Sequence, residues 1–351
     1  MLDINTLLKL TIERQASDLH LAPDYFPTLR INGELYPLKI TELVTQENAE
    51  SMLFSILNPE QKTNLIANKE IDFGFEYSGY RFRGNIYYSK GKLAAVFRLI
   101  AANIKTIEDL MLPPIFHHLT QVNHGLVLIT GPTGEGKSTT LASMINEINV
   151  NQAKNIITIE DPIEYVYPQA KSVISQRELH LDTHSWTVAL RSVLREDPDV
   201  VLVGEMRDYD TIQAVLTIAE TGHLVFSTLH TSTTPEAINR IIDVFPAHQQ
   251  NQVRSQLSSV LQAVVSQRLI PDATKTTRVP ALEILLNNSA VGSIIRDGKV
   301  FLLDNVLETE EKSDIIMFEK YMTKLYQRGV ITKETAYQYA IREQVIKKFL
   351  P

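Results

Sequence analysis

The sequence predicts an α/β protein with two domains, a small α+β domain followed by a larger domain built on a mostly parallel sheet. Its 351 residues exceed what one ordinary hydrophobic core holds. Up to about residue 100, short alternating segments are separated by turn residues, which favours antiparallel strands. From Gly125 onward, short apolar runs alternate with amphipathic stretches, which is typical of a parallel sheet with helices on both faces.

The first domain is expected to cover residues 1–100. Asn32-Gly33 lies between alternating residues and predicts a β-hairpin over 29–36. Turn residues separate three further antiparallel strands, at 72–77, 80–88 and 93–99, and helices are expected at 3–15 and 46–57. Residues 101–114 show no periodic pattern and end in Pro113-Pro114, so we expect a linker there.

The second domain is expected to cover residues 115–351. Leucine-rich or β-branched runs predict buried strands at 126–129, 156–159, 200–203, 224–228 and 281–285. The expected helices cover 139–149, 185–195, 210–220, 235–244 and 248–268, and the chain after about 305 is expected to be helical. Thr234-Pro235 predicts Thr234 as a helix N-cap. The long helix at 248–268 is expected to carry one apolar stripe, formed by Val253, Leu257, Val260, Leu261, Val264 and Val265.

A phosphate loop is the strongest functional signal in the sequence. The pattern G-x-x-x-x-G-K-S follows the strand at 126–129 and precedes the helix at 139–149, the context that separates a phosphate loop from a chance match. Its glycines let backbone N–H groups surround a phosphate. We expect Lys137 to reach the β- and γ-phosphates of ATP and the Ser138 hydroxyl to ligate Mg²⁺. The expected nucleotide-binding residues are Gly131, Pro132, Thr133, Gly134, Glu135, Gly136, Lys137, Ser138 and Thr139.

Carboxylates follow two of the predicted strands. Glu160, Asp161 and Glu164 come after the strand at 156–159, where they could hold Mg²⁺ or activate water; the alternative is a solvated acidic loop. Glu205 follows the run at 200–203 after one glycine and resembles the acid of a Walker B strand. Because Glu is one methylene longer than Asp, we expect Glu205 to hold Mg²⁺ through water.

Histidines and arginines supply the remaining candidates. His223 precedes the strand at 224–228 and His230 follows it. A neutral imidazole can donate to a phosphate oxygen, and His223 is the preferred candidate, with a structural role as the alternative. Arg81 and Arg83 are expected on one face of a strand, and Arg98 on a neighbouring strand. Either they are exposed strand arginines, or they reach a phosphate held by another subunit.

Composition excludes several classes of function. The chain contains no cysteine, which excludes a disulfide scaffold, a thiol nucleophile and Cys-ligated zinc, and suits a reducing cytoplasm. No run of 18 apolar residues is present, and residues 1–5 lack the basic region of a signal peptide. A formal net charge of −7 disfavours direct binding of nucleic acid.

Four ordered motifs resemble those of the PilT-like retraction ATPases of type IV pili, within the secretion-ATPase superfamily. They are a Walker A motif at 131–140, an aspartate box at 159–164, a Walker B motif at 194–208 and a histidine box at 219–231; residues 16–20 resemble the N-terminal signature. The resemblance covers nearly the whole chain. It implies a PAS-like N-terminal domain, a RecA-like P-loop ATPase domain and a ring of six subunits, with ATP bound between the two domains.

The resemblance also implies roles for individual residues. Lys137 and Ser138 bind phosphate and Mg²⁺, and Glu164 is the catalytic base. Glu205 supports Mg²⁺, and His223 senses the γ-phosphate. The candidate arginine fingers are Arg81, Arg83 and Arg98.

By this resemblance, the protein is expected to hydrolyse ATP to drive pilus retraction, in twitching motility and DNA uptake. The alternative is a pilus-assembly or type II secretion ATPase of the same superfamily; those usually carry a larger N-terminal domain and a four-cysteine zinc module. The implied partners are identical subunits in a hexamer, an inner-membrane platform protein and a second retraction ATPase. The implied location is the cytoplasm, docked peripherally at the inner membrane.

Three segments depart from the family pattern. Glu135 occupies a loop position that is usually Ser or Ala, and its charge is expected to weaken nucleotide binding unless the side chain points away. Residues 266–269 are closer to the accessory retraction ATPases of the PilU type. Residues 290–297 keep the Ile295-Arg296-acid ending of the retraction-linked segment but lack its first arginine.

Overall fold

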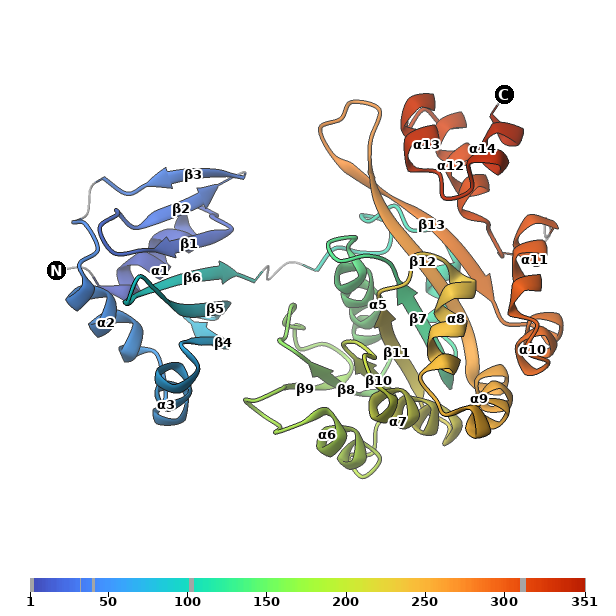
Figure 1. Cartoon of the computed structure of the whole chain (residues 1–351), viewed down its shortest axis with the longest axis horizontal. Helices are drawn as coiled ribbons and strands as arrows, with labels where there is room; N and C mark the ends of the chain where they lie inside the picture. Colours follow the sequence, from blue (N-terminus) through green and yellow to red (C-terminus); the bar gives the residue numbers. More distant parts are fainter. Residues whose placement is uncertain (1–2, 32, 40–41, 101–103, 310–313, 351) are drawn as a thin grey trace. The chain divides into compact units, whose positions relative to one another are not determined.

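The computed structural model describes residues 3–31, 33–39, 42–100, 104–309 and 314–350 (Figure 1). The chain divides into two compact units, residues 1–103 with 162–166, and residues 104–161 with 167–351. The first unit is α+β and the second contains a mostly parallel sheet, so the predicted fold class is confirmed. The expected domain limits and the linker at 101–114 stay a prediction, and residues 101–103 lie outside the described part.

The first unit is an antiparallel sheet with helices packed on it. The strand order is β3-β2-β1-β6-β5-β4, and every neighbouring pair is antiparallel. The expected hairpin of β2 and β3 is confirmed, although Asn32 lies outside the described residues. Its elements are α1 (Ile4–Glu13), β1 (Asp18–Leu21), β2 (Thr28–Ile31), β3 (Glu34–Pro37), α2 (Gln46–Ser55), α3 (Pro59–Asn68), β4 (Glu70–Tyr77), β5 (Tyr80–Ser89) and β6 (Lys92–Leu99).

The second unit contains a seven-stranded sheet in the order β13-β12-β7-β11-β10-β8-β9. Every neighbouring pair is parallel except β12 with β13. Its elements are α4 (Ile115–Leu119), β7 (Gly125–Thr130), α5 (Lys137–Asn151), β8 (Asn155–Glu160), β9 (Val173–Glu178), α6 (Trp186–Val193), β10 (Val200–Val203), α7 (Tyr209–Glu220), β11 (Leu224–Leu229), α8 (Thr234–Asp243), α9 (Ala247–Val260), β12 (Leu261–Pro271), β13 (Arg278–Leu286), α10 (Ser289–Arg296), η1 (Val300–Leu302), α11 (Leu303–Thr309), α12 (Phe318–Gln327), α13 (Lys333–Tyr339) and α14 (Glu343–Phe349).

Two hydrophobic cores cover the two faces of this sheet. Along β7, Leu126 and Leu128 face the core shared with α6 to α11. Val127 and Ile129 face the other core, shared with α4, α5 and α12 to α14. Burial on both faces explains why the central strands are continuous apolar runs rather than alternating ones.

The expected helix at 248–268 is confirmed up to Val260 and wrong beyond it, because α9 (Ala247–Val260) ends there and the chain continues as β12. Leu261 has φ −61° and ψ 130°, an extended conformation. Farther along, Val264 faces one core and Val265 the other, as in a strand that is buried on both faces. The predicted helical stripe therefore stops at Val260.

Two smaller differences have tertiary causes. The N-cap of α8 is Thr233, whose hydroxyl accepts from the Glu236 N–H, and not Thr234. Thr234 instead donates its hydroxyl to Glu283, 3.0 Å away on β13. The unexpected strand β9 is an edge strand with an exposed Val173, so it lacks the apolar run that marks the inner strands.

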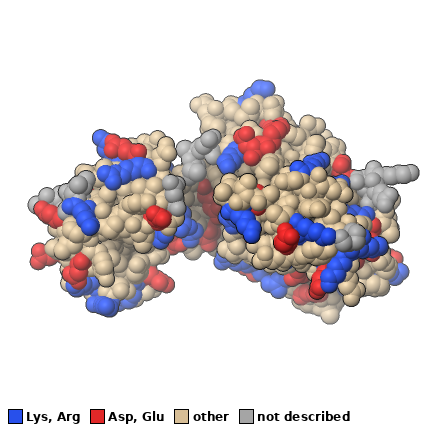
Figure 2. Space-filling view, turned by 90° about the horizontal axis from the view of Figure 1, so that it is seen from above, with Lys and Arg blue, Asp and Glu red and all other residues tan. Residues whose placement is uncertain are grey.

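The surface and the helices of the described residues add two observations. On the face that Figure 2 shows, basic and acidic side chains are interspersed over each unit. The described part of this face therefore presents no continuous basic strip of the kind that follows a nucleic-acid backbone. Within the described ranges, no helix combines the length and the apolar character needed to span a bilayer.

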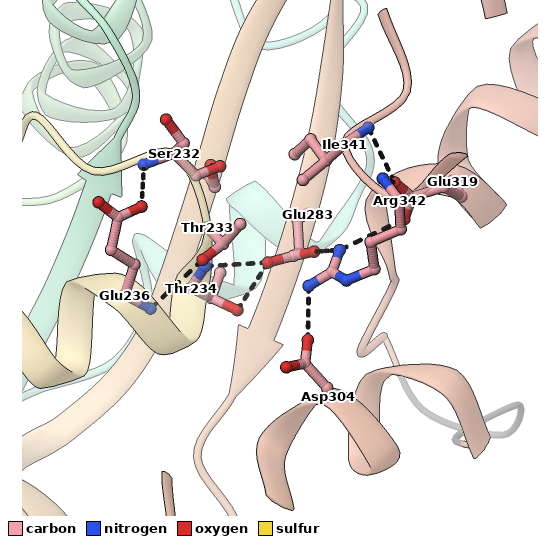
Figure 3. Close-up of polar contacts among 10 residues, drawn as sticks. Ser232, Thr233, Thr234, Glu236, Glu283, Asp304, Glu319, Ile341 and Arg342 are labelled. Carbon is pink, nitrogen blue, oxygen red and sulfur yellow. Dashed lines mark hydrogen bonds and ion pairs between the residues drawn. The ribbon is translucent and has the colours of Figure 1, made fainter. Parts of the chain in front are cut away.

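Figure 3 shows a charge cluster that ties the C-terminal helices to the sheet. Glu283 on β13 and Glu319 on α12 have side chains that are 0% exposed. Arg342 lies 2.8 Å from Glu283, 3.3 Å from Glu319 and 2.6 Å from Asp304 on α11. Burial lowers the pKa of the Arg342 guanidinium, but the three carboxylates outweigh it and raise this pKa above its usual value. Glu283 also accepts from the N–H and hydroxyl of Thr234, so the cluster reaches the start of α8.

Arg342→Met should destabilise the second unit by about 3–5 kcal/mol, because it leaves Glu283 and Glu319 buried without a counter-charge. Urea unfolding followed by circular dichroism measures this change. Arg328→Met, at an exposed arginine of the same region, is the matched control and should change the free energy of unfolding by less than about 0.5 kcal/mol. Equal stability of the Arg342 variant and the unmodified protein would contradict a stabilising role for the cluster.

Candidate active site

The phosphate loop connects the end of β7 to the start of α5. Gly131, Gly134 and Gly136 have φ of 145°, 84° and 78°, backbone conformations that favour glycine. At Gly131 space is also restrictive, since an added Cβ would lie 2.3 Å from the carbonyl oxygen of Gln267. The loop runs directly into the N-terminus of α5, whose first-turn N–H groups and partial positive charge favour phosphate binding. Of the other predicted loop residues, Thr133 is exposed, and those that are half-buried are Pro132, Glu135, Ser138 and Thr139.

Lys137 is folded back into this loop. Its side-chain ammonium donates to the carbonyl oxygens of Gly131 at 2.6 Å and Pro132 at 2.9 Å. The residue is only 8% exposed, so the loop carbonyls compensate the buried charge. The ammonium is therefore held at the mouth of the glycine loop, where a phosphate would bind.

Glu205 lies two residues beyond the end of β10. One of its oxygens is 2.8 Å from Nε2 of His230, and the carboxylate also pairs with Arg207. The preceding Gly204 lies against Trp186, because an added Cβ would come within 3.6 Å of the indole ring. His230 directly follows β11, and the parallel pairing of β7, β11 and β10 brings all three strand ends to one edge of the sheet.

His230 connects the phosphate loop to the Walker B acid. Its Nδ1 lies 3.4 Å from the Lys137 ammonium, which can only donate, so Nδ1 accepts. Burial, and then the charges of Lys137 and Arg207, lower the pKa of His230 below its usual value, which favours the neutral ring. In a neutral ring the proton then sits on Nε2 and is donated to Glu205. The sequence-based preference for His223 overlooks a usable signal, the position of His230 directly after a central strand.

His223 lies at the opposite end of β11. Its backbone oxygen accepts from the N–H of Gly125, the first residue of β7, and its ring Nδ1 is 3.1 Å from both the Thr221 hydroxyl and the Ile218 oxygen. A strand of this length places the two ends of β7 roughly 15–20 Å apart. The structure therefore does not bring His223 to the phosphate loop of its own unit.

The acidic segment after β8 is divided between the two units. Glu160, the last residue of β8, is 8% exposed and accepts from the Thr158 hydroxyl at 2.7 Å and from the Gln176 amide at 3.3 Å. Asp161 is exposed at the edge of the second unit. Glu164 belongs to the segment 162–166 of the first unit.

The expected common face of the three arginines is confirmed within the first unit. Arg83 on β5 is the direct cross-strand partner of Arg98 on β6, and Arg81 lies two residues from Arg83 on the same strand. Arg83 forms an ion pair with Asp72 at 2.5 Å, and Arg98 with Asp18 at 2.9 Å. The side chains of Arg83 and Arg98 remain 40% and 64% exposed, so both guanidinium groups are oriented by an acid and still accessible.

Known proteins resemble the chain along most of its length. The family model described as type II/IV secretion system protein matches residues 97–349. A twitching motility protein from Neisseria gonorrhoeae is 45% identical, over 88% of this chain and 83% of that protein. The type IV pilus retraction ATPase PilT from Pseudomonas aeruginosa is 41% identical, over 97% of this chain and 98% of that protein.

A solved structure agrees with these similarities. The crystal structure of the pilus retraction motor PilT with bound ADP superposes with a TM-score of 0.92 at 42% identity, and covers 99% of this chain and 100% of that one. The chain therefore belongs to the type II/IV secretion system protein family and is a nucleotide-binding ATPase of that family.

Proposed function

We propose that this protein is a motor ATPase that hydrolyses ATP to retract type IV pili, in twitching motility and DNA uptake. The observation that carries this proposal is the hydrogen-bonded chain of Lys137, His230 and Glu205 at the phosphate loop. It places a phosphate-binding cation and an acid suited to Mg²⁺ at one edge of the sheet, an arrangement typical of P-loop ATP hydrolysis, with an imidazole between them. Near full-length similarity to retraction ATPases supports the direction of the motor.

Ser138 and Glu205 are the residues that we assign to Mg²⁺. Ser138 follows Lys137 at the start of α5, and Glu205 follows β10 at the sheet edge that carries the phosphate loop. Mg²⁺ prefers hydroxyl, carboxylate and phosphate oxygens, so the residues fit the ion. When bound, Mg²⁺ neutralises charge on the phosphates. Lys137 orients the phosphates, and we assign to Glu164 the removal of a proton from the attacking water.

We assign the sensing of the γ-phosphate to His230 rather than to His223. His230 lies within hydrogen-bonding distance of both Lys137 and Glu205, whereas His223 lies beside the first residue of β7, at the far end of the strand. A neutral imidazole between these groups can exchange a partner when a phosphate arrives.

A ring of six subunits is part of the proposal. The first unit contributes Arg81, Arg83 and Arg98 on one sheet face but has no phosphate loop of its own. We propose that these arginines act on nucleotide held by the ATPase domain of their own or a neighbouring subunit. The further proposed partners are an inner-membrane platform protein and a second retraction ATPase, with the ring docked on the cytoplasmic side of that membrane.

The alternative is a pilus-assembly or type II secretion ATPase. The chain is 29% identical to the type II secretion system protein E of Xanthomonas campestris but covers only 53% of that protein. Residues 290–297, which lack the first arginine of the retraction-linked segment, form most of α10 and are the feature that favours this alternative. Full coverage of the retraction ATPases favours retraction.

Lys137→Ala should abolish ATP turnover, because it removes the ammonium at the phosphate loop. A phosphate-release assay measures this, with Lys171→Ala, at an exposed lysine, as the control that keeps activity.

In cells, Lys137→Ala should let surface pili accumulate while twitching motility and DNA uptake stop. Loss of surface pili instead would identify the protein as an assembly ATPase.

Glu164→Gln should keep nucleotide binding and lose turnover, since the change preserves size and removes only the proton acceptor. Glu205→Gln should weaken Mg²⁺-dependent binding as well. Binding of a fluorescent ATP analogue and phosphate release are measured side by side for both variants. Tight binding without hydrolysis in the Glu205 variant alone would reverse the two assignments.

Arg98→Ala should reduce kcat strongly, since such an arginine contributes roughly 10³–10⁵ in other NTPases. Mixing Arg98→Ala subunits with Lys137→Ala subunits tests action between subunits. If an arginine acts on a neighbour's nucleotide, some sites in mixed rings pair an intact loop with an intact arginine, and activity recovers. Only additive residual activity, with subunit exchange verified by a size-shift assay, would rule that arrangement out.

A further inference from the structure

Strand β12 extends past the end of its parallel neighbour β7. The last paired residues are Thr130 on β7 and Ser266 on β12, whereas β12 continues to Pro271. From Gln267 onward, the edge that faced β7 is therefore left to the phosphate loop. The approach is close, since an added Cβ on Gly136 would lie 3.1 Å from the Gln267 amide nitrogen.

Three hydrogen bonds fasten the loop and α5 to this part of β12. Gln267, only 2% exposed, donates its amide to the carbonyl oxygen of Glu135 at 2.7 Å. Its amide oxygen accepts from the Thr140 hydroxyl on α5 at 2.8 Å. The carboxylate of Glu135 accepts from the backbone N–H of Leu269 at 2.5 Å. The tip of the loop is thus held to β12 through its backbone and through its own acidic side chain.

The direction of the Glu135 side chain answers the electrostatic problem that the sequence raised. An acid in a phosphate loop repels phosphate if it points inward. Here the carboxylate accepts a hydrogen bond from the Leu269 N–H. This N–H lies on the edge of β12 that faced β7, beyond the last residue that pairs with β7. A charged acceptor on a backbone N–H forms one of the stronger hydrogen bonds in proteins.

We propose that Glu135 is a positioning residue. Its hydrogen bond to Leu269 holds the phosphate loop against β12 and thereby strengthens nucleotide binding. The inference rests on the loop as the nucleotide site of the proposed function. A glycine-rich loop loses conformational freedom when it closes on a phosphate, and a loop that is already held in shape loses less. Glu135 thus acts through the shape of the loop. It raises the affinity for nucleotide, whereas simple charge repulsion would lower it.

Titration of the full-length protein with a fluorescent ADP analogue tests the sign. Glu135→Ala and Glu135→Ser should each weaken binding about tenfold, the size expected for loss of one charge-assisted hydrogen bond. Glu135→Gln, which keeps an acceptor oxygen, should lose less than Glu135→Ala. Asp243→Ala, at an exposed acid on α8, removes the same charge elsewhere and is the control.

Equal or tighter binding by the Ala and Ser variants would overturn the proposal and leave repulsion as the role of the acid. A Gln variant as weak as the Ala variant would also overturn it, because the acceptor would then not matter. Failure of the unmodified protein to bind the analogue would count against the proposed function instead. If Glu135→Ala does not fold, as judged by circular dichroism, Glu135→Ser carries the same test.

Amide hydrogen exchange provides a readout that repulsion alone would not move. In nucleotide-free protein, the Leu269 amide should exchange faster in the Ala and Ser variants than in the unmodified protein, because its acceptor is gone. The Ile284 amide on β13, which donates to the Ile316 oxygen at 2.8 Å, is the internal reference and should not change. An unchanged exchange rate of the Leu269 amide would contradict its hydrogen bond to Glu135 and therefore the proposal.

Discussion

The parallel pairing of β7, β11 and β10 is the constraint on which the site depends. Parallel strands in register end at one edge of their sheet, so the segments that follow them must meet there. These segments carry Lys137, His230 and Glu205, and they come from parts of the chain that are far apart in sequence. Their polar groups form one hydrogen-bonded chain. The Lys137 ammonium donates to loop carbonyls and to the His230 imidazole, and the imidazole donates to the Glu205 carboxylate.

Local signals were enough to predict most of the architecture. The antiparallel first unit, the phosphate loop and the common face of Arg83 and Arg98 follow from alternation, turn residues and register. The start of β12 was missed because the apolar residues from Val253 to Val265 follow a helical spacing. Only the pairing of β12 with its neighbouring strands shows that the helix ends at Val260. The edge strand β9 was missed because its exposed residues leave no apolar run.

Other parts of the site depend on contacts that spacing along the chain does not reveal. The position of His230 directly after its strand favours it over His223, but its contacts with Lys137 and Glu205 appear only in the folded sheet. The orientation of Glu135 depends on how many residues β12 extends beyond its last pair with β7. Similarly, Thr234 reads as an N-cap in isolation, whereas the buried Glu283 engages its N–H and hydroxyl. In all three cases the deciding partner is distant in the sequence.

The contact between Trp186 and Gly204 has a practical consequence. Trp186 is the sole tryptophan of the sequence, and it lies against the residue that precedes Glu205. Indole emission responds to nearby charge and to water, so the tryptophan emission of this chain reports on one place, the strand end that carries the acid. The chain also lacks cysteine, so a single introduced thiol would carry a second dye without competition. Energy transfer between the two could follow the strand end through a catalytic cycle in an otherwise unmodified protein.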